Sequence, residues 1–552
     1  MESKKIFLCL LFLLLGVYAI GLFSGLLEND SAQFAVMSMR MVQEGDFLSL
    51  YKGTEPYLDK PHLHYWLAAA SYTVFGIYEF SYKLPGFLAL LLGAFSVFKM
   101  AQLLYSTPIA RAATLIFLSA QTIVLSGIDL RTDAVLTGFV ALSLWQFLAF
   151  LKAPHWRPMV FGALAAAMAF STKGHLALVM IGFPVLGYLI HERQWSVLLK
   201  KEILLGVFTF ILGICPILYA YYVQFDLHPE LVIRGQSERS GIFFILFEQS
   251  FERMSGQGMG TNSPDYLFFF HTFLWAFLPF TPLAIYLFFK RFKSKSLNAT
   301  DRTQGLLYGA LAILLLISFA QFKLPHYLNS SVPLWAVLVA GRVGGQGMLW
   351  KPLLYIQRGL FVLLIAVALT LCLWIFPYTF WGSYLMLALF VLGSIYWMYQ
   401  SKGVFNSVVI TGVLTAVLVN GILNTGFYPN LLQYQAGKTV SEKIMQSSYI
   451  SPDKVYKWGN AHSWAMDFGL RSPLKIVDQL EDFKSLSNVW MYLTESQLEA
   501  LSTTDISYTI EFCVPSYRIT RLKGSFLNPA TRLKNLEKRY LVFLPGSGSA
   551  LK

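Results

Sequence analysis

The sequence has few charged residues for its length. Only 13% of its 552 residues are Asp, Glu, Lys or Arg, whereas 56% are hydrophobic. Soluble domains carry about 25% charged residues, so a single soluble core cannot bury this much apolar surface. The apolar residues form many continuous runs of about 17–25 residues, the length that crosses a bilayer as a helix. Because these runs do not alternate with polar residues, they predict membrane-spanning helices and not the strands of a barrel.

Several chemical signatures are also missing. Three of the four cysteines, Cys9, Cys215 and Cys372, lie in apolar runs and only Cys513 lies in a polar region, so no disulfide framework is indicated. The nine histidines show no metal-ligand spacing, and there is no Walker loop or dinucleotide-binding glycine fingerprint. The net charge of +13 comes from scattered basic residues without a dense run. The composition therefore indicates neither nucleotide-dependent chemistry nor nucleic-acid binding.

The apolar runs predict an all-α polytopic membrane domain with about 13 transmembrane helices. The first run follows Lys4 and Lys5 as a signal peptide does, but its length of about 20 residues and its lack of a clear cleavage site favour an uncleaved anchor. The spans are expected near residues 6–25, 84–105, 108–126, 132–151, 157–171, 175–190, 203–223, 266–289, 305–322, 327–341, 359–376, 381–399 and 404–424.

The distribution of basic residues predicts the orientation. With the N-terminus inside, the short inner loops before residue 425 hold eighteen Lys or Arg residues and the longer outer loops hold ten, which agrees with the positive-inside rule. Fifteen of the nineteen acidic residues before residue 425 then lie on the outer side. An odd number of spans places the C-terminus outside. An active site built from carboxylates therefore has to face outward.

The chain is predicted to contain two domains. Residues 1–424 form the membrane domain, with long outer loops at 26–83 and 224–265. Within the first loop, the apolar stretch from Pro61 to Gly76 is too short to span and suits a helix that lies in the membrane interface. From residue 425 the composition changes, and short β-like runs (VWMYL, YLVFL) alternate with helix-like segments such as Glu495–Leu501. Residues 425–552 are therefore predicted to form a small outer α/β domain.

Asp30 is the first candidate for chemistry, because it follows the first span directly. The residues after it suit a helix with Phe34, Met37 and Met41 on one face. A purely structural interpretation makes Asp30 the N-cap of that helix. The functional interpretation makes it a carboxylate fixed at the membrane surface, where it can accept a proton from an incoming nucleophile.

The tripeptide Asp59-Lys60-Pro61 precedes the expected interfacial helix. It can be a simple turn whose lysine lays its aliphatic part on apolar surface. Alternatively, Lys60 binds a phosphate as a point charge, and Asp59 binds a cation or orients a substrate.

Ionisable residues also mark the start of the fourth span, in the motif Asp129-Leu-Arg131-Thr-Asp133. Asp133 lies at the membrane boundary, where a charged group is costly and indicates function, although an acid in the first helical turn also interacts well with the helix dipole. Arg131 can pair with Asp133 or bind a phosphate. Two further lysines, Lys173 and Lys323, lie in outer turns against the positive-inside trend, as an anion site requires.

Taken together, these pieces resemble the large membrane glycosyltransferases of the GT-C type, which use a sugar linked to a lipid phosphate. The most similar groups are the bacterial aminoarabinose (lipid A) transferases and the protein O-mannosyltransferases. The resemblance covers roughly residues 1–345 and rests on four pieces in the same order: Asp30 with the following MSMRMVQEGDFLSLYKGTEPYLDKPHLHYW, the tripeptide Asp59-Lys60-Pro61, RTDAVLT with Asp133, and KLPHYLNSSVPLWAVL from Lys323.

The resemblance implies a role for individual residues. Asp30 matches the catalytic carboxylate of the family, Asp133 matches a second acid of the site, and Lys60 matches the lysine beside the lipid-phosphate donor. Asp59 matches an acid near a bound divalent cation, where the family usually has Glu. Apart from the resemblance, the outward position of Arg131, Lys173 and Lys323 predicts further positive charge for the donor phosphate.

The chain departs from the family pattern at several positions. Ser31 stands where the family often has a second acid, and Gln33 and Phe34 stand where an Arg and a Tyr are common. In FEQSFERM, Gln249 occupies the position of a histidine that can help to bind the metal.

The sequence therefore predicts an inverting glycosyltransferase of the bacterial inner membrane. It is expected to move a sugar from a polyprenyl-phosphate donor to lipid A, a glycolipid, a glycan or a protein on the periplasmic face, with a divalent cation as the only implied cofactor. The alternative is a transporter or flippase of lipid-linked glycans, but such proteins place their key charges near the bilayer midplane. A non-catalytic receptor or assembly protein leaves the ordered Asp30, Lys60 and Asp133 motifs unexplained.

Overall fold

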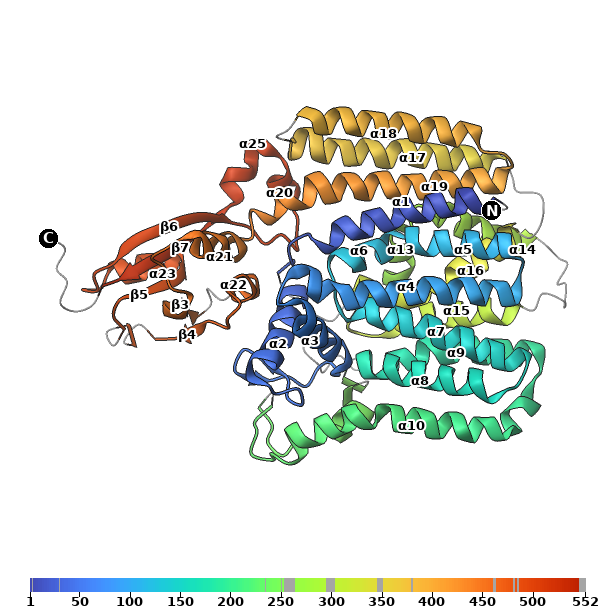
Figure 1. Cartoon of the computed structure of the whole chain (residues 1–552), viewed down its shortest axis with the longest axis horizontal. Coiled ribbons are helices and arrows are strands. Elements are labelled where there is room, and N and C mark those ends of the chain that lie inside the picture. Colours follow the sequence, from blue (N-terminus) through green and yellow to red (C-terminus); the bar gives the residue numbers. More distant parts are fainter. Residues whose placement is uncertain are drawn as a thin grey trace.

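The computed structural model of this chain is mostly helical, with a small β-sheet near the C-terminus (Figure 1). The long helices lie side by side in a bundle, and the sheet lies beyond one end of it. The N-terminus lies at the other end. The structure describes residues 1, 3–28, 30–233, 235–249, 251–252, 264–293, 303–344, 351–378, 381–459, 463–479, 482–483 and 486–545.

Helical structure coincides with every predicted span, because each run supplies enough apolar residues for a buried or lipid-facing helix. The helices of the bundle are α1 (Lys4–Leu22), α4 (Glu79–Leu104), α5 (Thr107–Ser119), α6 (Gln121–Ile128), α7 (Thr132–Lys152), α8 (Trp156–Lys173), α9 (His175–Glu192), α10 (Lys201–Tyr221), α13 (Phe268–Ala276), α14 (Thr281–Lys293), α15 (Gln304–Phe319), α16 (Val332–Gly344), α17 (Pro352–Thr370), α18 (Trp381–Gln400) and α19 (Val404–Ile422).

Within the described residues, eight helices are long and apolar enough to cross a membrane, or nine when one bent pair is counted as a span. The bent pair is α5 and α6, which meet at 53° within the predicted span 108–126. At the break, the backbone N–H of Gln121 donates to the carbonyl of Leu278 at 2.8 Å. The chain can bend there because this contact satisfies a backbone donor that an unbroken helix would pair internally.

Close packing between α4 and α7 positions the start of α7. Gly138 of α7 lies directly against the backbone of Ala89 in α4, so that a Cβ atom at residue 138 would overlap the Ala89 carbonyl oxygen. Small residues allow such close approach between membrane helices. The contact fixes the position of α7 along α4, and α7 carries Asp133 in its first turn.

The first outer loop contains two helices, α2 (Asp30–Glu44) and α3 (Leu63–Phe75), and a short hairpin of β1 (Tyr51–Lys52) and β2 (Glu55–Pro56). The predicted helices after Asp30 and between Pro61 and Gly76 are thus confirmed. Both lie at the end of the bundle that faces the sheet (Figure 1). The second loop contains the short helix α11 (Gly241–Phe243), a π-helical turn at Phe244–Glu248 and residues that the structure does not describe, among them Arg234 and Arg253.

The C-terminal sheet has five strands in the order β4-β3-β5-β7-β6. Strand β3 runs parallel to β4 and β5, whereas β7 is antiparallel to both β5 and β6. The runs VWMYL and YLVFL form β5 and β7, and the helix expected at Glu495–Leu501 is α23, so these predictions are confirmed. The elements are α20 (Tyr428–Leu432), α21 (Ala436–Gln446), β3 (Val455–Trp458), α22 (Trp464–Leu470), β4 (Lys475–Val477), β5 (Val489–Thr494), α23 (Glu495–Ser502), β6 (Thr509–Ser516), α24 (Gly524–Leu527), α25 (Pro529–Arg532) and β7 (Glu537–Leu544).

We expect Gly138→Val to destabilise the protein by about 1–3 kcal/mol, because the larger side chain forces α4 and α7 apart. Gly182→Val in α9 is the matched control, since a Cβ at residue 182 meets no atom within 4 Å. Thermal unfolding in detergent should show a lower Tm for the first variant only. Equal Tm values for the two variants would contradict the proposed packing constraint.

Candidate functional site

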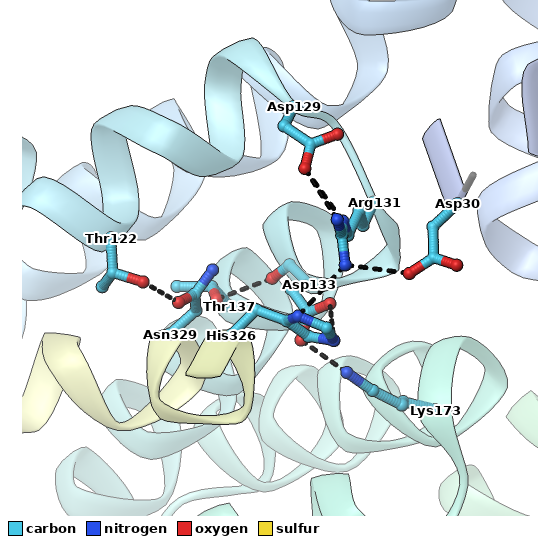
Figure 2. A network of polar contacts seen from close by, with 9 residues as sticks. All are labelled: Asp30, Thr122, Asp129, Arg131, Asp133, Thr137, Lys173, His326 and Asn329. Carbon is cyan, nitrogen blue, oxygen red and sulfur yellow. Dashed lines mark hydrogen bonds and ion pairs between the residues drawn. The ribbon is translucent and has the colours of Figure 1, made fainter. Parts of the chain in front are cut away.

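The candidate site lies where four segments of the chain meet (Figure 2). Asp30 comes from the first turn of α2, and residues 129–133 lead into α7. Lys173 comes from the last turn of α8, and His326 from the 3-10 helix Pro325–Ser331. Figure 2 shows these side chains pointing toward one another, so residues far apart in sequence form one cluster of charges.

Arg131 lies between two carboxylates. Its Nη1 donates to Asp30 Oδ2 at 2.8 Å, and its Nη2 lies 2.9 Å from Asp129 Oδ2. Burial acts to lower the pKa of Arg131, but the charges of Asp129 and Asp30 raise this pKa above its usual value. The guanidinium therefore stays charged and holds the Asp30 carboxylate, which is 41% exposed, at an accessible position.

Asp133 and Lys173 form a buried ion pair next to Arg131. Lys173 Nζ lies 2.5 Å from Asp133 Oδ1, and the two side chains are only 1% and 4% exposed. The ammonium group also lies over the ring of Tyr327, 4.4 Å from its centroid. The Asp133 carboxylate pairs with Lys173. The Arg131–Asp133 pair considered from the sequence is therefore wrong, and Arg131 pairs with Asp30 and Asp129 instead.

His326 completes the cluster. Its Nε2 lies 3.7 Å from Asp133 Oδ2, and its Nδ1 lies 3.4 Å from Arg131 Nη1. Burial lowers the pKa of His326 well below its usual value; Asp133 opposes this shift, and the positive charges of Lys173, Arg131 and Lys60 add to it. The imidazole is therefore neutral, with Nδ1 facing the arginine donor and the Nε2 proton facing Asp133.

The remaining predicted cations lie at different distances from this cluster. Lys60 lies close enough for its charge to lower the pKa of His326. Lys323 Nζ lies over the ring of Tyr266, 5.4 Å from its centroid, and its charge contributes to the lowered pKa of Asp265, for which the hydrogen bond from His271 is the larger cause. The structure therefore brings Asp30, Arg131, Asp133 and Lys173 together, with Lys60 beside them, whereas Lys323 contacts the outer segment before α13.

Gln249 holds the turn at Asp59. Its backbone carbonyl accepts a hydrogen bond from Gln249 Nε2 at 2.9 Å, and the Gln249 side chain is buried. Gln249 Oε1 lies where a Cβ of Gly174 would be, so that glycine leaves room for the amide. Among the residues that the structure describes, no group of three or more His, Cys, Asp or Glu side chains could hold a metal ion. Gln249 thus joins the turn at Asp59 to the turn after Lys173 by direct contact.

An open cleft of about 1030 Å³ lies beside Asp59. Its wall includes Tyr57, Arg239, Glu248 and Glu252. Arg239 Nη2 lies 3.0 Å from Glu248 Oε2 and also pairs with Glu252, so the second outer loop is held together by ion pairs at this wall. The cleft has room for a sugar-sized group, and of the predicted site residues only Asp59 lines it.

Sequence reasoning missed the roles of His326 and Asp129. Both residues lie within motifs in which a neighbouring residue, Lys323 or Asp133, was predicted to belong to the site. Nothing in the local sequence indicates that the His326 ring faces Arg131, which lies 195 residues earlier. Asn329 likewise accepts a hydrogen bond from Thr122 across 207 residues and fixes the 3-10 helix that presents His326.

Comparison with known proteins points to the same family resemblance as the sequence. A family model described as dolichyl-phosphate-mannose-protein mannosyltransferase matches residues 59–219. A protein of Yersinia pestis (strain Pestoides F) named undecaprenyl phosphate-alpha-4-amino-4-deoxy-L-arabinose arabinosyl transferase is 31% identical over 202 residues, which are 35% of this chain and 36% of the relative. A protein of the same name from Edwardsiella ictaluri (strain 93-146) is 26% identical over 321 residues, or 57% of this chain and 55% of the relative. The chain thus matches about a third to a half of the length of these relatives.

The fold is that of a known membrane protein. The crystal structure of ArnT from Cupriavidus metallidurans bound to undecaprenyl phosphate superimposes with a TM-score of 0.74 at 18% identity, and the match covers 100% of both chains. The structure of the same protein in the apo state gives a TM-score of 0.73. These findings confirm the resemblance, inferred from the sequence, to membrane glycosyltransferases that use lipid-phosphate-linked sugars.

We expect Lys173→Met to lower the free energy of unfolding by about 3–5 kcal/mol, because it leaves the buried Asp133 carboxylate without its partner. Adding Asp133→Asn should restore most of the lost stability, since the double variant buries no charge at residues 133 and 173. Lys438→Met is the control: it breaks the exposed Lys438–Glu442 pair, which is worth less than about 1 kcal/mol. Thermal unfolding in detergent measures all four proteins, and a single Lys173 variant as stable as wild type would contradict the assignment.

Proposed function

We propose that this protein is an inverting glycosyltransferase of the bacterial inner membrane, which transfers a sugar from a polyprenyl-phosphate donor to an acceptor at the periplasmic surface. The observation that carries the proposal is the accessible Asp30 carboxylate held by Arg131 beside the buried Lys173. An acid able to take a proton thus lies next to cations that can stabilise a departing phosphate. The names of the relatives and the bound undecaprenyl phosphate in the similar crystal structure support the donor class.

The chemistry follows from the charges of the site. The bond between the anomeric carbon and the phosphate oxygen breaks, and a new bond forms between that carbon and the acceptor oxygen or nitrogen. The electron pair of the broken bond stays on the phosphate, so Arg131, Lys173 and Lys60 stabilise the leaving group through their positive charge. Direct displacement from the opposite face inverts the configuration of the anomeric carbon.

Asp30 is the proposed catalytic base. When the acceptor is a hydroxyl or an amine, its proton moves to the Asp30 carboxylate as the new bond forms. When the acceptor is itself a phosphate, it carries a negative oxygen that needs no deprotonation, and Asp30 then only orients it. The acceptors considered are lipid A, another glycolipid, a glycan and a protein.

Asp133 acts differently in this scheme from the second catalytic acid expected from the sequence. It is almost fully buried and engaged by Lys173 Nζ. We therefore assign it to holding the lysine in place and to the orientation of the His326 ring. Lys323, which contacts Tyr266, is proposed to meet the donor phosphate only at the rim of the site.

The proposal includes a topology. Thirteen spans, with the N-terminus inside and residues 425–552 outside, follow from the distribution of basic residues along residues 1–424. The N-terminus and the C-terminal sheet lie at opposite ends of the bundle (Figure 1), which supports opposite sides of the membrane for them. The loops at 26–83 and 224–265 then face the periplasm together with Asp30, and α3 is proposed to lie in the membrane interface.

We expect Asp30→Asn to lower the rate of sugar transfer by about 10²–10⁴-fold while the protein stays folded, because the amide cannot accept the proton. Glu44→Gln is the matched control: it changes a carboxylate at the other end of α2 that pairs with Arg40, and it should keep the wild-type rate. The assay uses purified protein in detergent with a polyprenyl-phosphate donor pool and membrane extract, and it measures the release of free polyprenyl phosphate.

Two outcomes would change the proposal. A fully active Asp30→Asn variant would remove Asp30 from the chemistry but leave the enzyme class standing. If wild type releases no polyprenyl phosphate with any donor but still binds the lipid, the chain is better described as a transporter or flippase of lipid-linked glycans.

We expect chelators to leave the transfer rate unchanged, because the side chain that contacts the Asp59 turn is an amide, Gln249, and no group of three or more His, Cys, Asp or Glu side chains among the described residues could hold a metal ion. The measurement compares initial rates before and after treatment with EDTA and after re-addition of divalent cations. A loss of activity that a cation restores would show that a metal binds in spite of this contact.

A further inference from the structure

Residues 23–28 follow α1 and come shortly before Asp30, and side chains from distant parts of the chain hold them. At the start of this segment, Lys83 Nζ of α4 donates to the carbonyl oxygens of Gly21 and Ser24, at 3.1 and 2.8 Å. These bonds tie the last turn of α1 and the residues directly after it to α4. The beginning of the segment is therefore attached to the membrane bundle.

The end of the segment is attached to the C-terminal domain. The side-chain amide of Gln435, just before α21, donates to the Leu26 carbonyl at 2.9 Å and accepts from the Glu28 N–H at 2.8 Å. One glutamine thus forms both a donor and an acceptor contact with the backbone of the segment. The chain between Leu26 and Glu28 cannot shift without breaking both bonds.

Glu28 makes the strongest of these connections. Its carboxylate accepts hydrogen bonds from the Ser463 hydroxyl at 2.7 Å, the Trp464 N–H at 2.7 Å and the Ala465 N–H at 3.3 Å. Burial raises the pKa of Glu28, and the three hydrogen bonds act against this shift. A partly buried carboxylate that loses its donors is destabilised, so this contact resists displacement.

Apolar and polar contacts extend the connection along α2. Trp464, Ala465 and Phe468 of α22 belong to the same hydrophobic cluster as Val36 and other residues of α2. Near the far end of α2, Gln43 Nε2 donates to the carbonyl of Arg471 at 2.6 Å. Helix α22 therefore lies along α2 and is fastened to the first outer loop both at Glu28 and at Gln43.

We propose that the C-terminal domain is part of the catalytic apparatus, in which Glu28 serves as the positioning residue that sets the place of the Asp30 carboxylate. This inference rests on the proposed function of Asp30. Asp30 follows Glu28 by two residues, a distance of at most about 7 Å along the chain. Its carboxylate is partly exposed and lies 2.8 Å from Arg131 Nη1, so a displacement of its backbone changes that contact directly.

The size of the effect follows from the demands of group transfer. A displacement of about 1 Å of a reacting group can cost about 10²-fold in rate. Because Glu28 does not touch the donor phosphate site at Arg131 and Lys173, its loss should lower kcat and leave the KM for the donor nearly unchanged. A residue that only stabilised the fold would change the amount of folded protein and leave the kcat of that protein unaltered.

The test compares Glu28→Gln with Gln43→Ala and Asp30→Asn in the full-length protein. Glu28→Gln keeps the shape of the side chain but places an NH₂ group against hydroxyl and N–H donors, whereas Gln43→Ala removes one hydrogen bond from the same interface far from Asp30. We expect Glu28→Gln to lower kcat by about tenfold or more, with the donor KM within about twofold of wild type. Gln43→Ala should keep the wild-type kcat, even if its Tm falls as much.

The outcomes separate the inference from the proposed function. A wild-type kcat for Glu28→Gln beside an inactive Asp30→Asn would overturn the inference and leave the function in place. Equal losses of kcat in Glu28→Gln and Gln43→Ala at equal Tm would overturn it as well, since the effect on kcat would then not depend on the contact next to Asp30. An active Asp30→Asn variant would instead overturn the catalytic assignment. If Glu28→Gln does not yield folded protein, Gln435→Ala provides the same comparison of kcat and KM.

Discussion

The buried pair of Asp133 and Lys173 is the interaction on which the site depends. Two opposite charges 2.5 Å apart, both nearly inaccessible to water, are stable only when each keeps the other and the surrounding donors and acceptors stay in place. The pair therefore requires α7 and α8 to keep a fixed position along each other's axes. It also occupies Asp133, so that Arg131 is left to bind Asp30 and Asp129. The position of the more exposed Asp30 carboxylate thus depends on the buried Asp133–Lys173 pair.

The cations and the carboxylate of the site are carried by different parts of the structure. Arg131 and Lys173 lie at the ends of bundle helices whose packing includes the glycine contact between α4 and α7. Asp30 begins α2, which packs against α22 in the C-terminal part of the chain. A donor with a lipid chain has to enter from the membrane, and an acceptor approaches from the aqueous side or along the surface. Under the proposed function, the division therefore places the groups proposed to bind the donor phosphate on the bundle and the proposed base next to the acceptor's approach.

Much of the fold could be predicted from the sequence because its causes are local. Continuous apolar runs gave the bundle helices, and β-branched and aromatic runs gave strands such as β5 (Val489–Thr494). The bend between α5 and α6 was not predicted, because the Leu278 carbonyl that receives the free N–H lies about 150 residues away. For the site, the charged residues could be identified from their cost at a membrane boundary. Their pairing could not: Arg131 with Asp30 and Lys173 with Asp133 are set by how the helices pack, which no local pattern records.

For the same reason, the sequence of residues 425–552 alone does not indicate a function for them. Glu28 appears in the sequence only as one of several acids after the first span, and Ser463 and Trp464 lie some 435 residues later. Only the folded chain shows that the N–H groups of α22 surround the Glu28 carboxylate. A domain that merely covered the outer face would need apolar contact with it and nothing more. Instead, the partly buried Glu28 carboxylate and an amide that forms two backbone bonds hold the few residues before Asp30, and α22 packs along α2 after it. This concentration of specific contacts is expected of a domain that fixes the position of a reacting group, since shape complementarity alone leaves the neighbouring backbone free to shift by the ångström that matters for transfer.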